Sequence, residues 1–180
     1  MPTKRLQSEK ELHYAVWPTA WGPMGAAAGE AGVARIELPH YQRDDLEQLL
    51  AWEHPNARQG DGPFETLIEL SRRYFDAERV DFDAVVCEMP PEKTFTGKVL
   101  RACRAIGYGQ TRGYGELAKA IGRPDAARAV ATALGSNPLP LVVPCHRVTY
   151  ADGRCGGFSA AGGPALKQRM LELERRVTAG

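Results

Sequence analysis

Residues 139–148 are Leu-Pro-Leu-Val-Val-Pro-Cys-His-Arg-Val, and this stretch determines how the rest of the chain is interpreted. A short apolar run, residues 141–143, ends at Pro144, which has no backbone N–H and a fixed φ. The next side chains are therefore expected at a strand end or in a turn. They are Cys145 and His146, and a thiol beside an imidazole can act as a nucleophile because an adjacent base favours the thiolate. Most Cys-His pairs are structural, so the interpretation depends on the neighbouring segments.

Length and composition set broad limits. The chain has 180 residues, enough for one large or two small domains with their own cores. It has no apolar run of 18 residues and no signal-peptide pattern, which predicts a cytoplasmic protein that does not bind membranes, nucleoid-associated in a prokaryote or nuclear in a eukaryote. The four cysteines form no C-x-x-C pair, which suits a reducing compartment and argues against a disulfide framework.

Charge is distributed unevenly along the chain. Residues 1–92 contain 9 Lys and Arg against 17 Asp and Glu, whereas residues 93–180 contain 14 against 5. The overall net charge of +1 therefore conceals an acidic first half and a basic second half. A basic half of this kind favours binding to a polyanion such as nucleic acid. The alternative is a charge match between two domains.

The first half has the pattern of a small α/β unit. Alternating apolar residues between glycine and proline turns predict extended segments at 12–16 and 33–38. Helices are predicted over 44–52 and from Pro63 onward, and residues 82–86 are predicted to form a strand that closes the sheet. The histidines of this half are scattered and have no cysteine pair beside them, so we predict no metal site.

The change in charge coincides with a proline-rich segment, residues 89–93. Domain boundaries fall in such segments. We therefore predict an N-terminal domain over 1–88, a linker over 89–93, and a C-terminal domain over 94–180.

The second half is predicted to begin with one helix, followed by a helix-turn-helix. Thr94 is a suitable N-cap for a helix that extends to Ile106. Two short helices are predicted at 113–121 and 125–134, joined by a Gly-Arg-Pro turn at 122–124.

The exposed face of the second short helix is unusual for a DNA-recognition helix. Such helices normally present several polar side chains to the bases, but here Arg128 has only Ala129, Ala131 and Thr132 beside it. Small side chains allow close approach to a narrow groove, and a lone arginine can enter the base stack. The alternative is an alanine-rich helix with one solvated arginine.

The segments after Cys145 have the features of a pocket. Residues 148–150 are predicted to be extended, and a reversal at 151–153 is predicted to return 154–158 beside them. Gly156 and its neighbour allow close approach of a ligand to the backbone. A last helix is predicted over 163–176.

Two glutamates of this last helix are candidates to support His146. Glu172 lies far from the apolar stripe of the helix, whereas Glu174 lies at its flank, where a carboxylate can face the interior. We therefore choose Glu174.

The intact Pro-Cys-His-Arg stretch, the Asn-Pro turn at 137–138 and the helix-turn-helix together resemble the O6-alkylguanine-DNA alkyltransferase family over residues 94–174. The resemblance implies an α/β fold, with a ribonuclease H-like N-terminal domain followed by a mostly helical, winged-helix-like DNA-binding domain that holds the active site. It also implies irreversible transfer of an alkyl group from O6-alkylguanine in double-stranded DNA to Cys145, by a monomer without a cofactor.

The resemblance further implies a role for each matching residue. The implied catalytic residues are Cys145 as acceptor, His146 as base, Glu174 behind it, and Tyr114, which donates to the flipped guanine. The implied substrate-binding residues are Asn137, Val148, Phe158 and Ser159. The implied DNA-binding residues are Arg128, Tyr114, Ala127, Ala129 and Arg147, with Arg128 filling the gap left by the flipped nucleotide. Relatives often have tyrosine in place of Phe158, so a hydroxyl contact at that position is lost.

Two other function classes stay open on the residues alone. A non-catalytic damage sensor or winged-helix regulator would also bind DNA, but relatives that bind without reacting lack the cysteine. A Cys-His hydrolase would use the same pair, but it would leave the basic half and Arg128 without a purpose.

Overall fold

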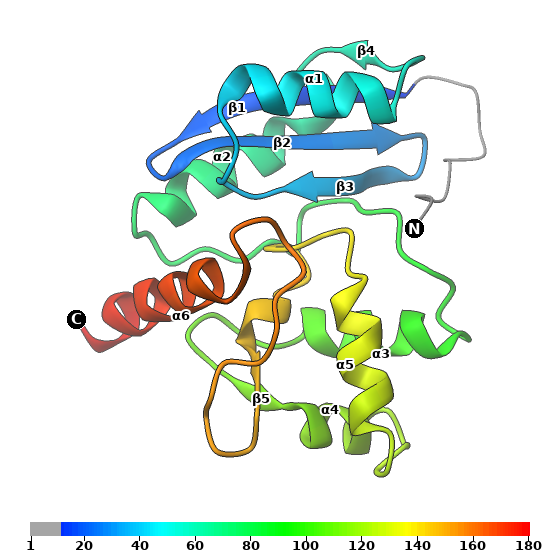
Figure 1. The fold of residues 1–180 in the computed structure, drawn as a ribbon, viewed down its shortest axis with the longest axis vertical. Coiled ribbons are helices and arrows are strands. Elements are labelled where there is room, and N and C mark those ends of the chain that lie inside the picture. Colours follow the sequence, from blue (N-terminus) through cyan, green and yellow to red (C-terminus); the bar gives the residue numbers. More distant parts are fainter. Residues whose placement is uncertain (1–11) are drawn as a thin grey trace.

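The computed structural model describes residues 12–180, and the first half of this range forms a four-stranded sheet (Figure 1). Strands β1 (His13–Thr19), β2 (Gly22–Gly29) and β3 (Gly32–Glu37) form an antiparallel meander, and β4 (Arg58–Gln59) pairs in parallel with β1. The order across the sheet is β3-β2-β1-β4. The predicted turns are confirmed, and Gly22 and Gly32 have positive φ values that favour glycine.

Helices cover both faces of this sheet, as Figure 1 shows. Helix α1 (Arg43–Glu53) packs on one face, where Val16 meets Leu46 and Leu50. Helix α2 (Glu65–Phe75) packs on the other face, where Trp17 donates a hydrogen bond of 2.9 Å to the Ser71 hydroxyl. Successive strand residues point to opposite faces, which explains why neighbouring residues of β1 enter different cores.

The strand predicted over 82–86 is wrong. Phe82 and Val85 are both buried, and Val85 N–H donates to the Phe82 carbonyl, so the segment is a turn rather than an alternating strand. The Arg104 guanidinium holds this turn by donating to the carbonyls of Phe82, Asp83 and Val85. The fourth strand of the sheet is β4, and the segment after the turn reaches the sheet through an isolated parallel bridge between Cys87 and Val33.

The second half is mostly helical, as predicted. Helix α3 (Phe95–Arg104) is capped by the Thr94 hydroxyl, which accepts from Gly97 N–H at 3.0 Å. The helix-turn-helix consists of α4 (Tyr114–Ala120) and α5 (Ala127–Gly135), and the last helix is α6 (Gly163–Ala179), which extends beyond its predicted end. A short parallel pair, β5 (Arg112–Gly113) with β6 (Val148–Thr149), lies beside α4.

Of two segments near Cys145, one differs from its prediction and one agrees with it. The apolar run 141–143 is a turn in which Leu141 has φ 77° and Val143 N–H donates to the Leu139 carbonyl. The predicted return of 154–158 is confirmed by the Tyr150 N–H···Arg154 O bond of 3.0 Å, and the returning segment has no regular secondary structure. Apolar composition predicts extended backbone at 141–143, and local hydrogen bonds with the positive φ of Leu141 override it.

The two halves share one hydrophobic core. Ile36 N–H of β3 donates to the Pro138 carbonyl at 2.9 Å, and the Arg169 guanidinium of α6 lies 3.7 Å from the centre of the Trp21 ring. These contacts fix the turn before Cys145 and helix α6 against the sheet. None of the helices described for residues 12–180 is long and apolar enough to cross a membrane.

Candidate active site

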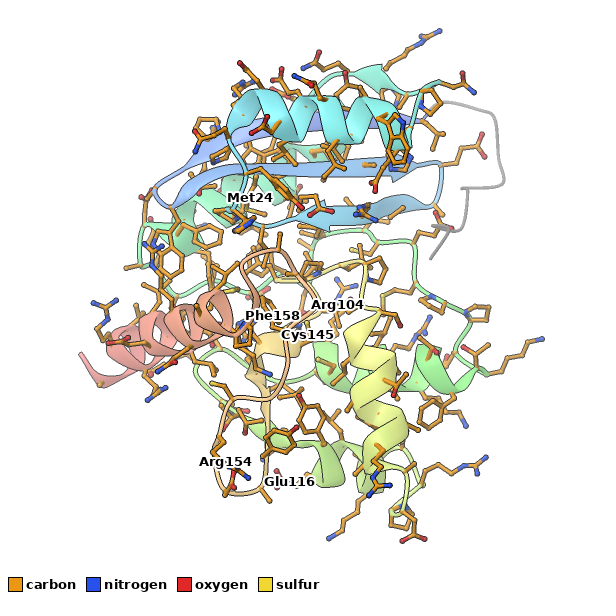
Figure 2. All side chains as sticks on the ribbon, viewed as in Figure 1. Met24, Arg104, Glu116, Cys145, Arg154 and Phe158 are labelled. Carbon is orange, nitrogen blue, oxygen red and sulfur yellow. The ribbon has the colours of Figure 1, made fainter. Side chains whose placement is uncertain are left out.

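Cys145 lies at the wall of a cavity of about 130 Å³ between α5 and the loop after β6. Figure 2 shows Cys145 and Phe158 next to each other in the second half of the molecule, where both line this cavity. The other lining residues are Tyr114, Ala131, Leu134, Gly135, Tyr150, Gly157 and Ser159. The cavity thus has three aromatic rings and one nucleophile in its wall.

The turn before Cys145 is held by the Asn137 amide. Its Nδ2 donates to the Val143 carbonyl at 2.9 Å and to the Cys145 Sγ at 3.1 Å, and its Oδ1 accepts from Leu139 N–H at 3.0 Å. Burial raises the pKa of the Cys145 thiol, while the bond from Asn137 and the positive charge of Lys167 act in the opposite direction. Both groups favour the thiolate, which is the reactive form.

The 3-10 turn η2 (Cys145–Arg147) directs the His146 ring into the interior, where it is fully buried. Its Nε2 lies 2.8 Å from the Glu174 Oε1, and its Nδ1 has no hydrogen-bond partner among the described residues. Burial lowers the pKa of His146, against the opposing influence of Glu174. Neutral His146 therefore donates through Nε2 to Glu174, which leaves Nδ1 as a free acceptor.

Glu174 is the centre of a buried polar network. Its carboxylate accepts from His146, from the Arg147 guanidinium at 2.9 to 3.1 Å, from the Tyr74 hydroxyl at 2.9 Å and from Gly109 N–H at 2.9 Å. Burial raises the pKa of Glu174, but hydrogen bonds and charge from His146 and Arg147 outweigh it and lower the pKa to about 2. Glu172, the rejected alternative, is exposed.

The DNA contact predicted for Arg147 is wrong. The side chain is 6% exposed, and its guanidinium binds Glu174 and the Ile106 carbonyl. An arginine beside a reactive cysteine in a basic half looks like a phosphate ligand in the sequence. Its buried partner on α6 is separated from it by 27 positions and is not visible locally.

Lys167 is a site residue that the sequence prediction does not include. Its ammonium group is buried, and it donates to the Val148 carbonyl at 2.6 Å and to the Gly157 carbonyl at 3.4 Å. It joins the two segments that border the cavity. The available signal is its spacing, since a residue seven positions before Glu174 lies on the same face of α6.

The predicted substrate-binding residues occupy different parts of the site. Phe158 and Ser159 line the cavity, whereas Val148 is buried and its carbonyl is bound to Lys167. Tyr114 also lines the cavity, with its ring 5.5 Å from that of Tyr150.

Gly156 lies directly against Tyr114. A Cβ at this position would overlap the Tyr114 hydroxyl, so glycine is required for the observed position of the ring.

The exposure of the residues on α5 agrees with the inward and outward faces predicted from helical spacing. Arg128 and Ala129 are exposed and Ala127 is half-buried, while Val130 and Leu134 are in the core. In the part of the chain that the structure describes, the Arg128 side chain makes no ion pair. This face stands beside the cavity, because Ala131 and Leu134 of the same helix line it.

Comparisons with known proteins give a consistent result. A family model described as the DNA-binding domain of 6-O-methylguanine DNA methyltransferase matches residues 94–176. The methylated-DNA–protein-cysteine methyltransferase of Mycobacterium tuberculosis H37Rv is 34% identical over 165 residues, 91% of this chain and 93% of that protein. The protein of the same name from Mycolicibacterium paratuberculosis is 46% identical over 113 residues, 63% of this chain and 66% of that protein.

A solved structure extends the comparison to three dimensions. The crystal structure of Mycobacterium tuberculosis OGT in complex with DNA matches with a TM-score of 0.76 at 32% identity. The match covers 92% of this chain and 94% of that one. The likeness therefore includes both the sheet and the helical half.

Proposed function

Because this chain belongs to the family of methylated-DNA–protein-cysteine methyltransferases, we infer that it repairs DNA by direct reversal and transfers the alkyl group to its own Cys145. The observation that supports this role best is the arrangement at the cavity. Cys145 lies in its wall, and the next residue, His146, is bound to the buried Glu174. DNA is the partner, and we propose that O6-alkylguanine in a duplex is the substrate.

We propose that the damaged nucleotide leaves the duplex to react. An O6 substituent inside a duplex cannot reach a buried thiol, so the base has to be flipped into the cavity. The aromatic rings of Tyr114 and Phe158 suit a planar base. The outer face of α5 would lie in the minor groove, where Ala127 and Ala129 allow close approach and Arg128 fills the vacated place in the stack.

The transfer then proceeds in a balanced step. Cys145 loses its proton to His146 Nδ1 through a water, and Glu174 stabilises the resulting imidazolium. The thiolate attacks the alkyl carbon, an S–C bond forms, and the C–O bond breaks with its electron pair going to the guanine. Tyr114 donates toward a ring nitrogen as negative charge develops there, and the guanine finally gains the proton. The thioether has no good leaving group, so each molecule acts once.

We also propose the bounds and fold type of each domain, the oligomeric state and the location of the protein. We propose a ribonuclease H-like domain over 1–88, a linker over 89–93 and a winged-helix-like domain over 94–180. The helix-turn-helix with the adjacent β5–β6 pair supports the second of these. We propose that the protein acts as a monomer in the cytoplasm.

Intact mass after incubation with a duplex containing O6-methylguanine tests the function. One added methyl group per molecule, mapped to the peptide with Cys145, is the expected result. Binding without a change in mass would indicate a damage sensor. Many turnovers per molecule would indicate a hydrolase. Label on Cys155 would overturn the assignment of the acceptor.

A further inference from the structure

One member of the Glu174 network comes from the other half of the chain. The Tyr74 hydroxyl, on α2, donates to the Glu174 Oε1 at 2.9 Å across 100 positions of sequence. Both side chains are at most 1% exposed. The Tyr74 ring also stands edge-on to the His146 ring, with 6.4 Å between their centres. Tyr74 therefore contacts both partners of the His146–Glu174 pair.

Tyr74 donates to Glu174 Oε1, the same carboxylate oxygen that binds His146. Glu174 Oε1 accepts from His146 Nε2, from Tyr74 and from the Arg147 guanidinium, whereas Oε2 accepts from Gly109 N–H and Arg147 Nε. A donor on Oε1 limits rotation of the carboxylate and also withdraws part of its negative charge. Together with Arg147, Tyr74 can thus influence both the direction and the strength of the bond between Glu174 and His146.

We propose that Tyr74 is a positioning residue for alkyl transfer, which acts through Glu174 to hold His146 in the orientation and basicity that deprotonate Cys145. This inference rests on the proposed function. It assigns part of the reactive apparatus to the acidic, sheet-forming half of the molecule.

Tyr108 shows that packing of this aromatic cluster does not by itself require a bonded hydroxyl. Its ring is edge-on to Tyr74 at 5.9 Å, and its hydroxyl is buried without a hydrogen-bond partner among the described residues. The two tyrosines share a position in the core and differ in their contact with Glu174. Tyr108→Phe is therefore a matched control for Tyr74→Phe.

The first experiment compares single-turnover rates of alkyl transfer for the wild type, Tyr74→Phe and Tyr108→Phe, with O6-methylguanine duplex and with free O6-benzylguanine. A hydrogen bond to a charged group is worth roughly tenfold or more, so we expect Tyr74→Phe to react about tenfold more slowly with both substrates. Duplex affinity should be unchanged, and Tyr108→Phe should react like the wild type. Equal rates for the two variants would overturn the proposal. An unreactive wild type would instead overturn the proposed function.

A double-mutant cycle separates positioning from stability. If Tyr74 acts through Glu174, adding Tyr74→Phe to Glu174→Gln should cause no further loss of rate. A loss in the double variant that equals the loss in the wild-type background would mean that Tyr74 acts elsewhere, and the proposal would fail.

The pH profile of the rate gives a readout that packing alone does not move. The charged or titratable groups around His146 are Glu174 and Lys167 from α6, Arg147 and Cys145 from its own turn, and Tyr74 from α2. Removing the Tyr74 donor leaves more negative charge on Oε1, which favours protonated His146. We expect the acid limb of the profile to move to higher pH in Tyr74→Phe and to stay in place in Tyr108→Phe. An unmoved limb in Tyr74→Phe would contradict the proposed control of His146.

Discussion

Behind Cys145, on the inner side of the cavity, His146, Arg147 and Glu174 are buried and hydrogen-bonded to one another. The outer face of α5 instead presents the exposed side chains of Arg128 and Ala129. The inner side has its geometry before any substrate arrives, because Glu174 accepts from four protein groups. Among the described residues, Arg128 on the outer face has no ion pair, and in the proposed function DNA would supply its partners. The comparison indicates that the groups proposed for chemistry are preorganised by hydrogen bonds, whereas the face proposed for recognition would depend on its shape.

The sharpest separation of the two sides is expected from Cys145→Ser. A hydroxyl is a far weaker nucleophile than a thiolate, so alkyl transfer should be lost entirely. The outer face of α5 is untouched, so affinity for a duplex should be retained. Intact mass measures the first effect and a gel-shift titration the second. Loss of both would mean that the two sides are not independent.

The next largest effect is expected from Glu174→Gln. Removing the carboxylate charge leaves the Arg147 guanidinium buried without its partner, which typically costs about 3–5 kcal/mol of stability. The rate of transfer should fall on the order of a hundredfold, because the base loses its support. Urea unfolding and single-turnover kinetics measure the two effects.

The control for Glu174→Gln is Glu172→Gln on the same helix. Glu172 is exposed, and its replacement should change neither stability nor rate. Similar behaviour of the two variants would remove the distinction between the buried network and the surface.

Acid should weaken the inner side in two stages. The pKa of His146 is lowered by burial, so the unfolded chain binds its proton first and stability begins to fall below the ordinary pKa of 6.5. The pKa of Glu174 is lowered from 4.5 to about 2, so a further loss on the order of 3 kcal/mol is expected as pH falls through this range. Denaturant unfolding between pH 7 and about pH 2 measures the loss. Glu174→Gln should lack the second stage, and its persistence there would contradict this account.

The smallest effect concerns the outer face. Flipping costs a few kcal/mol, and less for a mispaired base, so Arg128→Ala should lose roughly tenfold in rate on a paired lesion and less on a mispaired one. Free O6-benzylguanine needs no flipping and should react normally. The control Arg123→Ala removes an exposed positive charge from the turn before α5. Its rates on the paired lesion, the mispaired lesion and the free base should not differ in this way. Equal loss of Arg128→Ala on duplex and free base would mean that Arg128 supports the pocket.

The local features of the fold can be predicted from the sequence. The spacing of apolar residues locates the helices of the second half, and the flank position of Glu174 distinguishes it from Glu172. These inferences succeed because helical periodicity is a local property of consecutive residues. The pairing of the acceptor Cys145 with the base His146 is equally local, since the two residues are adjacent in the sequence.

What the sequence cannot predict depends on distant partners. Tyr74 lies on an apolar stripe and looks like any core aromatic, because its partner is 100 positions away. Arg147 looks like a DNA ligand for the same reason. The run Leu141 to Val143 fails for a different, local reason: its composition favours a strand, but the Asn137 amide and a positive φ at Leu141 make it a turn.

The spacing of the Glu174 network also has a consequence for the nascent chain. His146 precedes Glu174 by 28 positions, so the ribosome completes the Cys-His pair before it adds the carboxylate. Until α6 folds back, His146 lacks its anchor and Cys145 lacks the Lys167 charge that favours the thiolate. The thiol is then an ordinary cysteine, largely protonated at neutral pH. For a protein that reacts once, each newly made molecule therefore gains the support for its base last, when the final helix is complete.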